Sequence, residues 1–182
     1  MNLIIHTPRL ILRQATQKDC EAILDFYNQN KSFFDQYEAT KPDNFYTLAM
    51  QENIINYEQK EMLLSRGIRY YIFLLDSPET LVGTVSLSNM VHGVFNRANL
   101  GYKISKSLMH NGYAIEAVSA FLNECIPYYK LHRIEAYILE ENLPSINLIN
   151  KLNFQPEGIA REYAIIDGKY RDMLRYSYIV TD

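Results

Sequence analysis

The sequence has few cysteines and no long apolar run, and both shortages narrow the class of protein that it can encode. Its two cysteines, Cys20 and Cys125, are too few for a disulfide framework, and we expect both to be buried, reduced thiols on helices. No apolar run approaches the roughly 18 residues that a membrane span needs, and the N-terminus lacks the charged-then-apolar pattern of a signal peptide. We therefore expect a soluble, cytoplasmic protein with no membrane partner.

Basic charge is also scarce. The chain has 18 Lys and Arg against 21 Asp and Glu, which gives a formal net charge of −3 and a pI near 5.8. Such a chain has no overall basic field to neutralise phosphates, so direct binding to nucleic acid is not expected. The four histidines show no metal-ligand spacing, and no Gly-x-x-x-x-Gly-Lys run is present. We therefore expect neither a metal site nor a P-loop nucleotide enzyme.

What the chain does have is a regular order of amphipathic segments. With 48% apolar residues, its 182 residues suffice for a single domain, 1–182. Arg9 to Arg13 alternates like a half-buried strand, and Asp19 is placed to cap a helix through Tyr27. The next segment, 47–65, predicts a helix with Leu48, Ile55 and Met62 on its apolar face, and it is followed by a hairpin over 69–75 and 81–88. A loop over 89–96 then leads into a strand that ends near Ile104, and a helix that Pro127 stops comes after it. The rest of the chain predicts a strand over 133–139, a short helix, and a hairpin over 158–166 and 170–180. This order predicts an α+β fold whose sheet is covered on both faces.

The most informative stretch runs from Gly101 to Ala120. A strand ending in Tyr102-Lys103-Ile104 leads through Met109-His110-Asn111-Gly112-Tyr113-Ala114 into an amphipathic helix. Unpaired backbone N–H groups at such a helix start, together with the positive end of the helix dipole, make an anion site suited to a pyrophosphate. Gly112 would let a phosphate approach the main chain. Many strand-to-helix junctions carry a glycine, so this stretch alone does not decide between a binding site and an ordinary turn.

A second motif is Asn142-Leu143-Pro144-Ser145, which opens a short helix that closes at Lys151-Leu152-Asn153-Phe154. Together the two motifs resemble those of the GCN5-related N-acetyltransferase (GNAT) superfamily. The resemblance implies a three-layer α/β/α fold with a mixed, mostly antiparallel sheet of about seven strands and a splay between the fourth and fifth. It implies acetyl-coenzyme A as the acetyl donor, with its pyrophosphate on residues 109–114 and its pantetheine arm beside Asn142 and Ser145. Backbone groups of Tyr102, Lys103 and Ile104, freed by the splay, would bind that arm as an added strand would.

Other segments resemble the ribosomal-protein-alanine acetyltransferase (RimJ/RimL-type) branch over nearly the whole chain, namely residues 7–13, 87–89, 100–102, 157–158 and 167–172. This resemblance implies an amine acceptor, for which the N-terminus of a ribosomal protein is the first candidate, and a monomer or homodimer. Polyamines and aminoglycosides are alternative acceptors, because similar folds serve small amines. A non-catalytic acyl-coenzyme A-binding or regulatory module is a second class of function that the sequence leaves open.

Three positions depart from the family pattern. Met109 replaces the usual Gln or Arg at the head of the phosphate loop, which removes one polar contact to the cofactor, although His110 and Asn111 could act as donors instead. Asn153 replaces a glycine at little cost, because asparagine tolerates the left-handed conformation that ends a helix. Ile149 occupies the position at which many relatives have a tyrosine acid. The resemblance therefore leaves Ser145 as the proton donor to sulfur, and Asn142 to orient the pantetheine or a water; each could instead only support the start of the helix.

No carboxylate stands out as a general base. Glu38, Glu116 and Glu135 are candidates, but we expect each to be a solvated charge. Without a strong base, an α-amine with a pKa near 8 is a better acceptor than a lysine near 10.4, because the lysine must give up about 3 kcal/mol more to lose its proton. An aromatic segment with several acidic residues could bind a cationic peptide or only pack a helical arm onto the sheet; it contains Phe33, Phe34, Tyr37, Phe45 and Tyr46.

Overall fold

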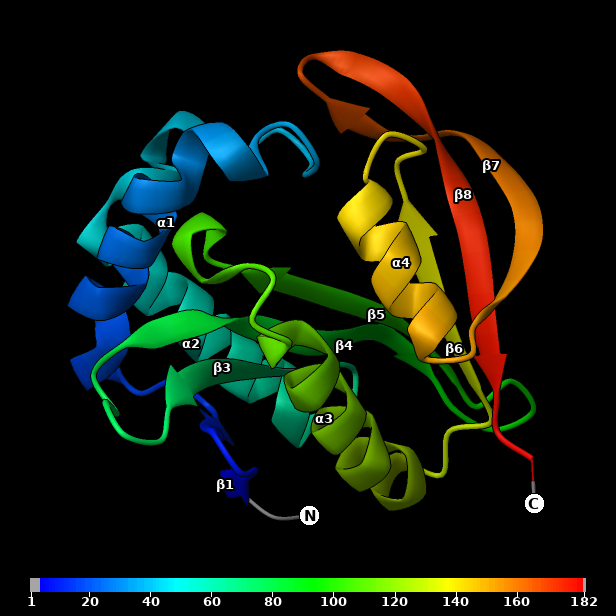
Figure 1. Cartoon of the computed structure of the whole chain (residues 1–182), viewed down its shortest axis with the longest axis horizontal. Helices are drawn as coiled ribbons and strands as arrows, with labels where there is room; N and C mark the ends of the chain where they lie inside the picture. The colour runs from blue at the N-terminus through cyan, green and yellow to red at the C-terminus, as the bar shows by residue number, and fades with distance from the viewer. Residues whose placement is uncertain (1–3, 182) are drawn as a thin grey trace.

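The computed structural model describes residues 4–181, and eight strands of this range form one sheet (Figure 1). The spatial order is β1-β2-β3-β4-β5-β6-β8-β7, and every pairing is antiparallel except that of β5 with β6. The strands are β1 (Ile4–His6), β2 (Leu10–Arg13), β3 (Ile68–Leu74), β4 (Leu81–Val91), β5 (Arg97–Ile104), β6 (Arg133–Ile138), β7 (Gln155–Ile166) and β8 (Lys169–Ile179).

In the described part of the chain, four α-helices cover the sheet in two layers: α1 (Cys20–Phe34), α2 (Leu48–Leu63), α3 (Tyr113–Tyr129) and α4 (Leu143–Lys151). In Figure 1, α3 and α4 lie in front of the sheet and α2 lies behind it; α1 packs against α2 and β4. The buried strand β3 shows why both layers are needed. Tyr70 on β3 packs with Phe121 of α3, whereas the next residue, Tyr71, belongs to the cluster with Ile23 of α1 and Ile55 of α2. Successive side chains of a strand point to opposite faces, so a strand with apolar side chains on both faces requires cover on both.

The sheet opens at its middle. The parallel ladder between β5 and β6 joins only Arg97–Asn99 to Arg133–Glu135. Beyond these residues β5 continues along β4, while β6 continues along β8, so the two described strands diverge as Figure 1 shows. This is the expected splay, and the three-layer α+β architecture is confirmed. The sheet has one strand more than expected because Ile4–His6 pairs with β2.

Several local predictions need correction. The helix α3 does not stop at Pro127 but continues to Tyr129, and it ends at Lys130, whose φ of 52° is left-handed. A proline in the last turn removes only one hydrogen bond of the helix. Asp19 does not cap α1 with its side chain; its carboxylate accepts from the backbone N–H of Thr16 and from Arg13 instead. Leu48, expected on an apolar face, is 42% exposed.

The predicted helix positions of both cysteines are confirmed, since buried Cys20 begins α1 and buried Cys125 lies on α3. The loop predicted from residue 89 begins later, because β4 extends to Val91. Within residues 4–181, none of the helices combines the length and the apolar character that crossing a membrane requires.

Candidate active site

The start of α3 is a cradle of backbone N–H groups. Gly112 is its N-cap, with a left-handed φ of 79°, and it supplies no side chain to cap the helix. The first intrahelical bond of this turn runs from the N–H of Glu116 to the carbonyl of Gly112, so the N–H groups of Tyr113, Ala114 and Ile115 are not used by the helix. These groups and the helix dipole favour an anion at this point. The predicted phosphate loop therefore has the expected backbone geometry.

A network that sequence reasoning did not find holds this loop in place. Arg9, just before β2, pairs with Glu116 of α3 at 2.6 Å, and its Nη1 donates to the carbonyl of Asn111 at 2.8 Å. Thr7 donates to the same carboxylate at 2.6 Å. Burial alone would raise the pKa of Glu116, but the hydrogen bonds from Thr7 and Arg9 outweigh it and lower that pKa. Arg9 thus neutralises the only acidic residue in the first turn of α3, next to the place where an anion would bind.

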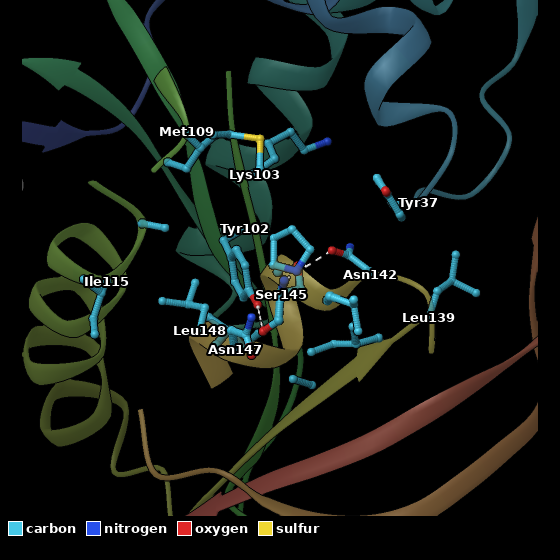
Figure 2. Close-up of a pocket in the computed structure, with 18 of the residues that line it drawn as sticks. Tyr37, Tyr102, Lys103, Met109, Ile115, Leu139, Asn142, Ser145, Asn147 and Leu148 are labelled. Carbon is cyan, nitrogen blue, oxygen red and sulfur yellow. Dashed lines mark hydrogen bonds between the residues drawn. The ribbon is translucent and has the colours of Figure 1, made fainter. Parts of the chain in front are cut away.

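The start of α4 lies across the splay from this loop. Asn142 is the N-cap of α4, and its side-chain oxygen accepts the backbone N–H of Ser145 at 3.2 Å. The hydroxyl of Tyr102, on β5, donates to the carbonyl oxygen of Ser145 at 3.2 Å. Figure 2 shows both contacts, with Tyr102 and Asn142 approaching Ser145 from different elements. Burial raises the pKa of Tyr102, so its phenol stays protonated and able to donate at neutral pH.

One cavity of about 580 Å³ passes between β5 and β6 and joins these parts. It is lined on one side by the loop before α3 and by the first turns of α3 and α4. At its other end it reaches Phe33 and Phe34 of α1, followed by Tyr37 and Glu38. The cavity therefore connects the two faces of the sheet through the splay, and a donor and an acceptor could approach one another from opposite ends.

Nearly all of the predicted site residues line this cavity: Tyr102, Lys103, Ile104, Met109, His110, Gly112, Tyr113, Ala114, Asn142 and Ser145. Asn111 does not. Its side-chain amide donates to the carbonyls of Leu108 and Met109 and so folds back into its own loop. Ile149 is fully buried in the core, so it contributes packing rather than chemistry. Asn153 has a φ of 62°, the left-handed conformation expected for the position that replaces a glycine.

The carboxylates that the sequence offered as bases are all ion-paired. Glu38 contacts Lys103 at 2.6 Å and Lys41 at 2.7 Å. Burial alone would raise the pKa of Glu38, but the two lysines outweigh it and lower that pKa. The expectation of solvated charges is wrong for Glu135, whose side chain is 2% exposed. Burial would raise the pKa of Glu135, but hydrogen bonds led by that from Arg133 lower it to about 2. Groups with lowered pKa values are weak bases.

The aromatic segment packs rather than standing open. Phe34 is 3% exposed and belongs to the core cluster of α1 and α2, with Phe33, Phe45 and Tyr46 packed against it. The cations over its rings are lysines of the chain itself. The Nζ of Lys103 lies 5.2 Å from the ring centre of Phe34, and Lys31, Lys41 and Lys106 lie over Tyr46, Phe45 and Phe33. This arrangement favours the packing alternative for the segment.

Comparisons with known proteins point to the same family as the motifs of the sequence. The model of the "Acetyltransferase (GNAT) domain" matches residues 9–155, so the chain belongs to this family and its class is that of the N-acetyltransferases. The probable N-acetyltransferase YjcK of Bacillus subtilis (strain 168) is 33% identical over 165 residues, 90% of each chain. The ribosomal protein uS5-alanine N-acetyltransferase of Escherichia coli (strain K12) is 31% identical over 170 residues, 91% of this chain and 85% of its own. Mycobacterium smegmatis RimJ in complex with CoA-disulfide is 25% identical with a TM-score of 0.88, covering 93% of this chain and 81% of its own.

Proposed function

We propose that this N-acetyltransferase transfers an acetyl group from acetyl-coenzyme A to the α-amine at a protein N-terminus. The observation that carries the proposal is the cavity that runs through the splay, which both the helix start at Gly112 and Ser145 line. Relatives named as ribosomal-protein acetyltransferases, such as the uS5 enzyme at 31% identity, support the choice of acceptor.

The residues present fit the donor. The open N–H groups after Gly112 suit a pyrophosphate, and a Cβ at Gly112 would lie 3.3 Å from Nη2 of Arg9, so glycine keeps the cradle clear. This contact uses main chain, which is why Met109 in place of a polar side chain does not abolish the site. The backbone of β5 at Tyr102, Lys103 and Ile104 is free of β6 and borders the cavity, where it can bind an amide-rich arm.

When bound, acetyl-coenzyme A supplies the thioester carbonyl that a neutral amine attacks, with release of the free thiol. Ser145 donates its hydroxyl proton to the departing sulfur. The new amide nitrogen loses a proton to water, and water returns a proton to the oxygen of Ser145. Its position in the first turn of α4 is held from two sides, by the cap from Asn142 and the hydrogen bond from Tyr102. Such support fixes the hydroxyl relative to the cavity better than a loop would.

The electrostatics support an α-amine as the acceptor. Glu38, Glu116 and Glu135 all have lowered pKa values, so none of them is suited to remove a proton from a lysine ammonium. An α-amine requires about 3 kcal/mol less for deprotonation, so water can accept its proton. The proposed reaction then needs an acid for the thiolate but no strong base.

The test is a thiol-release screen with peptides that carry a free N-terminus, the same peptides blocked at the N-terminus but carrying a lysine, polyamines and aminoglycosides. We expect turnover on the free N-termini. Ser145→Ala should lower kcat by roughly 10²-fold at unchanged affinity for acetyl-coenzyme A, as removal of a general acid does. Ser77→Ala, in the loop between β3 and β4, is the matched control and should leave kcat unchanged.

The screen also distinguishes the other functions. Faster turnover on lysine or on a small amine than on a matched N-terminus would contradict the proposed acceptor. Binding of acetyl-coenzyme A in calorimetry without thiol release from any acceptor would favour a regulatory module. An unchanged kcat in Ser145→Ala would show that the hydroxyl is not the proton donor.

A further inference from the structure

A second hollow, of about 300 Å³, lies on the sheet face that Arg97, Asn99 and Glu135 share. On β5, Ala98 and Leu100 alternate with Arg97 and Asn99. Ala98 and Leu100 belong to the core under α3, so Arg97 and Asn99 point to the opposite face. Tyr137 of β6 lines both this hollow and the large cavity through the splay. The two spaces are therefore neighbours on the side from which the acceptor would approach.

The wall between them is a pair of stacked tyrosines. The rings of Tyr137 and Tyr163 lie 4.1 Å apart with an interplanar angle of 10°. Tyr163 belongs to β7, where the pairing with β8 shifts register between Ala160 and Ala164 and Glu162 has a φ of 48°. Such a bulge re-aims the side chains beside it. The hydroxyl of Tyr137 is fixed by donating to Glu135 at 3.0 Å.

The arginines around the hollow differ in how closely they pair with carboxylates. Glu135 is buried and pairs with Arg133 and Arg175, each at 2.7 Å. Arg97 is the third arginine of this group, but it is 3.8 Å from Glu135 and its side chain is 44% exposed. Glu157, which pairs with Arg133 and Arg175, gives the group a second negative charge. Three arginines against two glutamates leave one positive charge in excess, and Arg97 is the member least engaged by its partner.

The spacing along β5 sets a length. Gly101 borders the large cavity and Arg97 borders the hollow, four residues further back along the same strand. A strand rises about 3.3 Å per residue, so the two positions are about 13 Å apart, which is the span of about four residues of an extended peptide.

We infer that the acceptor polypeptide continues from the splay over the Tyr137–Tyr163 pair into this hollow, where Arg97 binds an acidic side chain about four residues from the acetylated amine. The inference rests on the proposed function, because it extends the acceptor beyond its first residue. A peptide fits better than a free anion, since Tyr137 makes the hollow continuous with the cavity in which the amine would react. An extended peptide can also use the polar side chain of Asn99 and the tyrosine faces along its course.

The experiment measures kcat/KM for a series of octapeptides that begin with alanine. Each peptide carries one glutamate at a different position, and its control carries glutamine at the same position. We expect glutamate near the fourth or fifth residue to raise kcat/KM by about 2- to 5-fold at low salt, the size of an exposed charge contact. Arg97→Gln should abolish the preference, and Arg97→Glu should transfer it to peptides with lysine at that position. Arg161→Gln, an exposed arginine of β7 that lines neither space, should keep the original preference.

The Arg97 variants should fold, because Glu135 keeps Arg133 and Arg175, and circular dichroism checks this. Turnover of N-terminal peptides with no positional preference, or with a preference that survives Arg97→Gln, overturns this inference and leaves the proposed function intact. Failure of every peptide, with thiol release from small amines only, overturns both.

Discussion

Replacing Glu135 with glutamine tests whether the group of charged side chains around Glu135, Arg133 and Arg175 stabilises the fold. Glu135 is 2% exposed, and its pKa is lowered from the usual 4.5 to about 2. A pKa that is lowered in the folded state contributes stability above the unfolded value near 4.5, and this contribution is lost as the pH falls toward 2. A shift of this size corresponds to about 3 kcal/mol at pH 7.

The variant removes the buried one of the two carboxylates that Arg133 and Arg175 share, and Glu157 remains as their partner. Their side chains are 22% and 37% exposed, so water recovers part of the loss, and we expect Glu135→Gln to lower the free energy of unfolding at pH 7 by about 2–3 kcal/mol. From the linkage relation, about 2 kcal/mol of the difference from the wild type should vanish between pH 6 and pH 3.

Urea unfolding followed by circular dichroism at a series of pH values measures both quantities. Glu141→Gln is the control, since the ion pair of Glu141 with Arg171 is 49% and 39% exposed and should contribute less than about 1 kcal/mol. A loss in Glu135→Gln that is the same at pH 6 and pH 3, or no larger than that of the control, would refute the reasoning.

Three further predictions concern the backbone and the phosphate loop. A Cβ at Gly83 would lie 2.1 Å from the carbonyl oxygen of Lys103, so Gly83→Ala must push β4 from β5 and should destabilise the fold by more than about 2 kcal/mol in urea unfolding. Gly112→Ala and Gly168→Ala both force a left-handed alanine and should each cost about 1–2 kcal/mol of stability, but only the first should raise the Kd for acetyl-coenzyme A in calorimetry. Arg9→Gln should raise KM for acetyl-coenzyme A about 5- to 10-fold with little change in kcat, because it releases the loop before the N–H groups that are the proposed phosphate ligands; an unchanged KM would remove Arg9 from the proposed site.

The sequence predicts the parts of the site that depend on local backbone conformation. A glycine between a strand and an amphipathic helix gives an open helix start, and the structure has it at Gly112. The order of strands and helices follows in the same way from short-range periodicity. The prediction of an element's end is wrong where the surrounding structure outweighs the preference of a single residue. Pro127 indicated a helix end, but a proline in the last turn costs little, so α3 continues to Tyr129.

The environment of charged side chains is what the sequence does not predict. Glu135 and Arg175 are 40 residues apart in the chain, and only the pairing of β6 with β8 brings them together. The same holds for Arg9 and Glu116, which meet because β2 lies beside the start of α3. From the sequence alone, one expects such charged residues to be solvated, because most are. Tertiary contacts decide which of them are buried and paired.

The two ends of the cavity also differ in the kind of chemistry that defines them. At the end near Gly112, main-chain N–H groups are the proposed ligands, and these are the same for any side chains that preserve the conformation. At the other end, Tyr37, Glu38, Lys103 and Tyr137 present side chains, and Lys103 satisfies Glu38 rather than leaving it open to a cationic acceptor. A single substitution there changes charge and shape at once. Donor binding should therefore tolerate changes such as Met109, whereas acceptor choice should respond to single substitutions around Glu38 and Arg97.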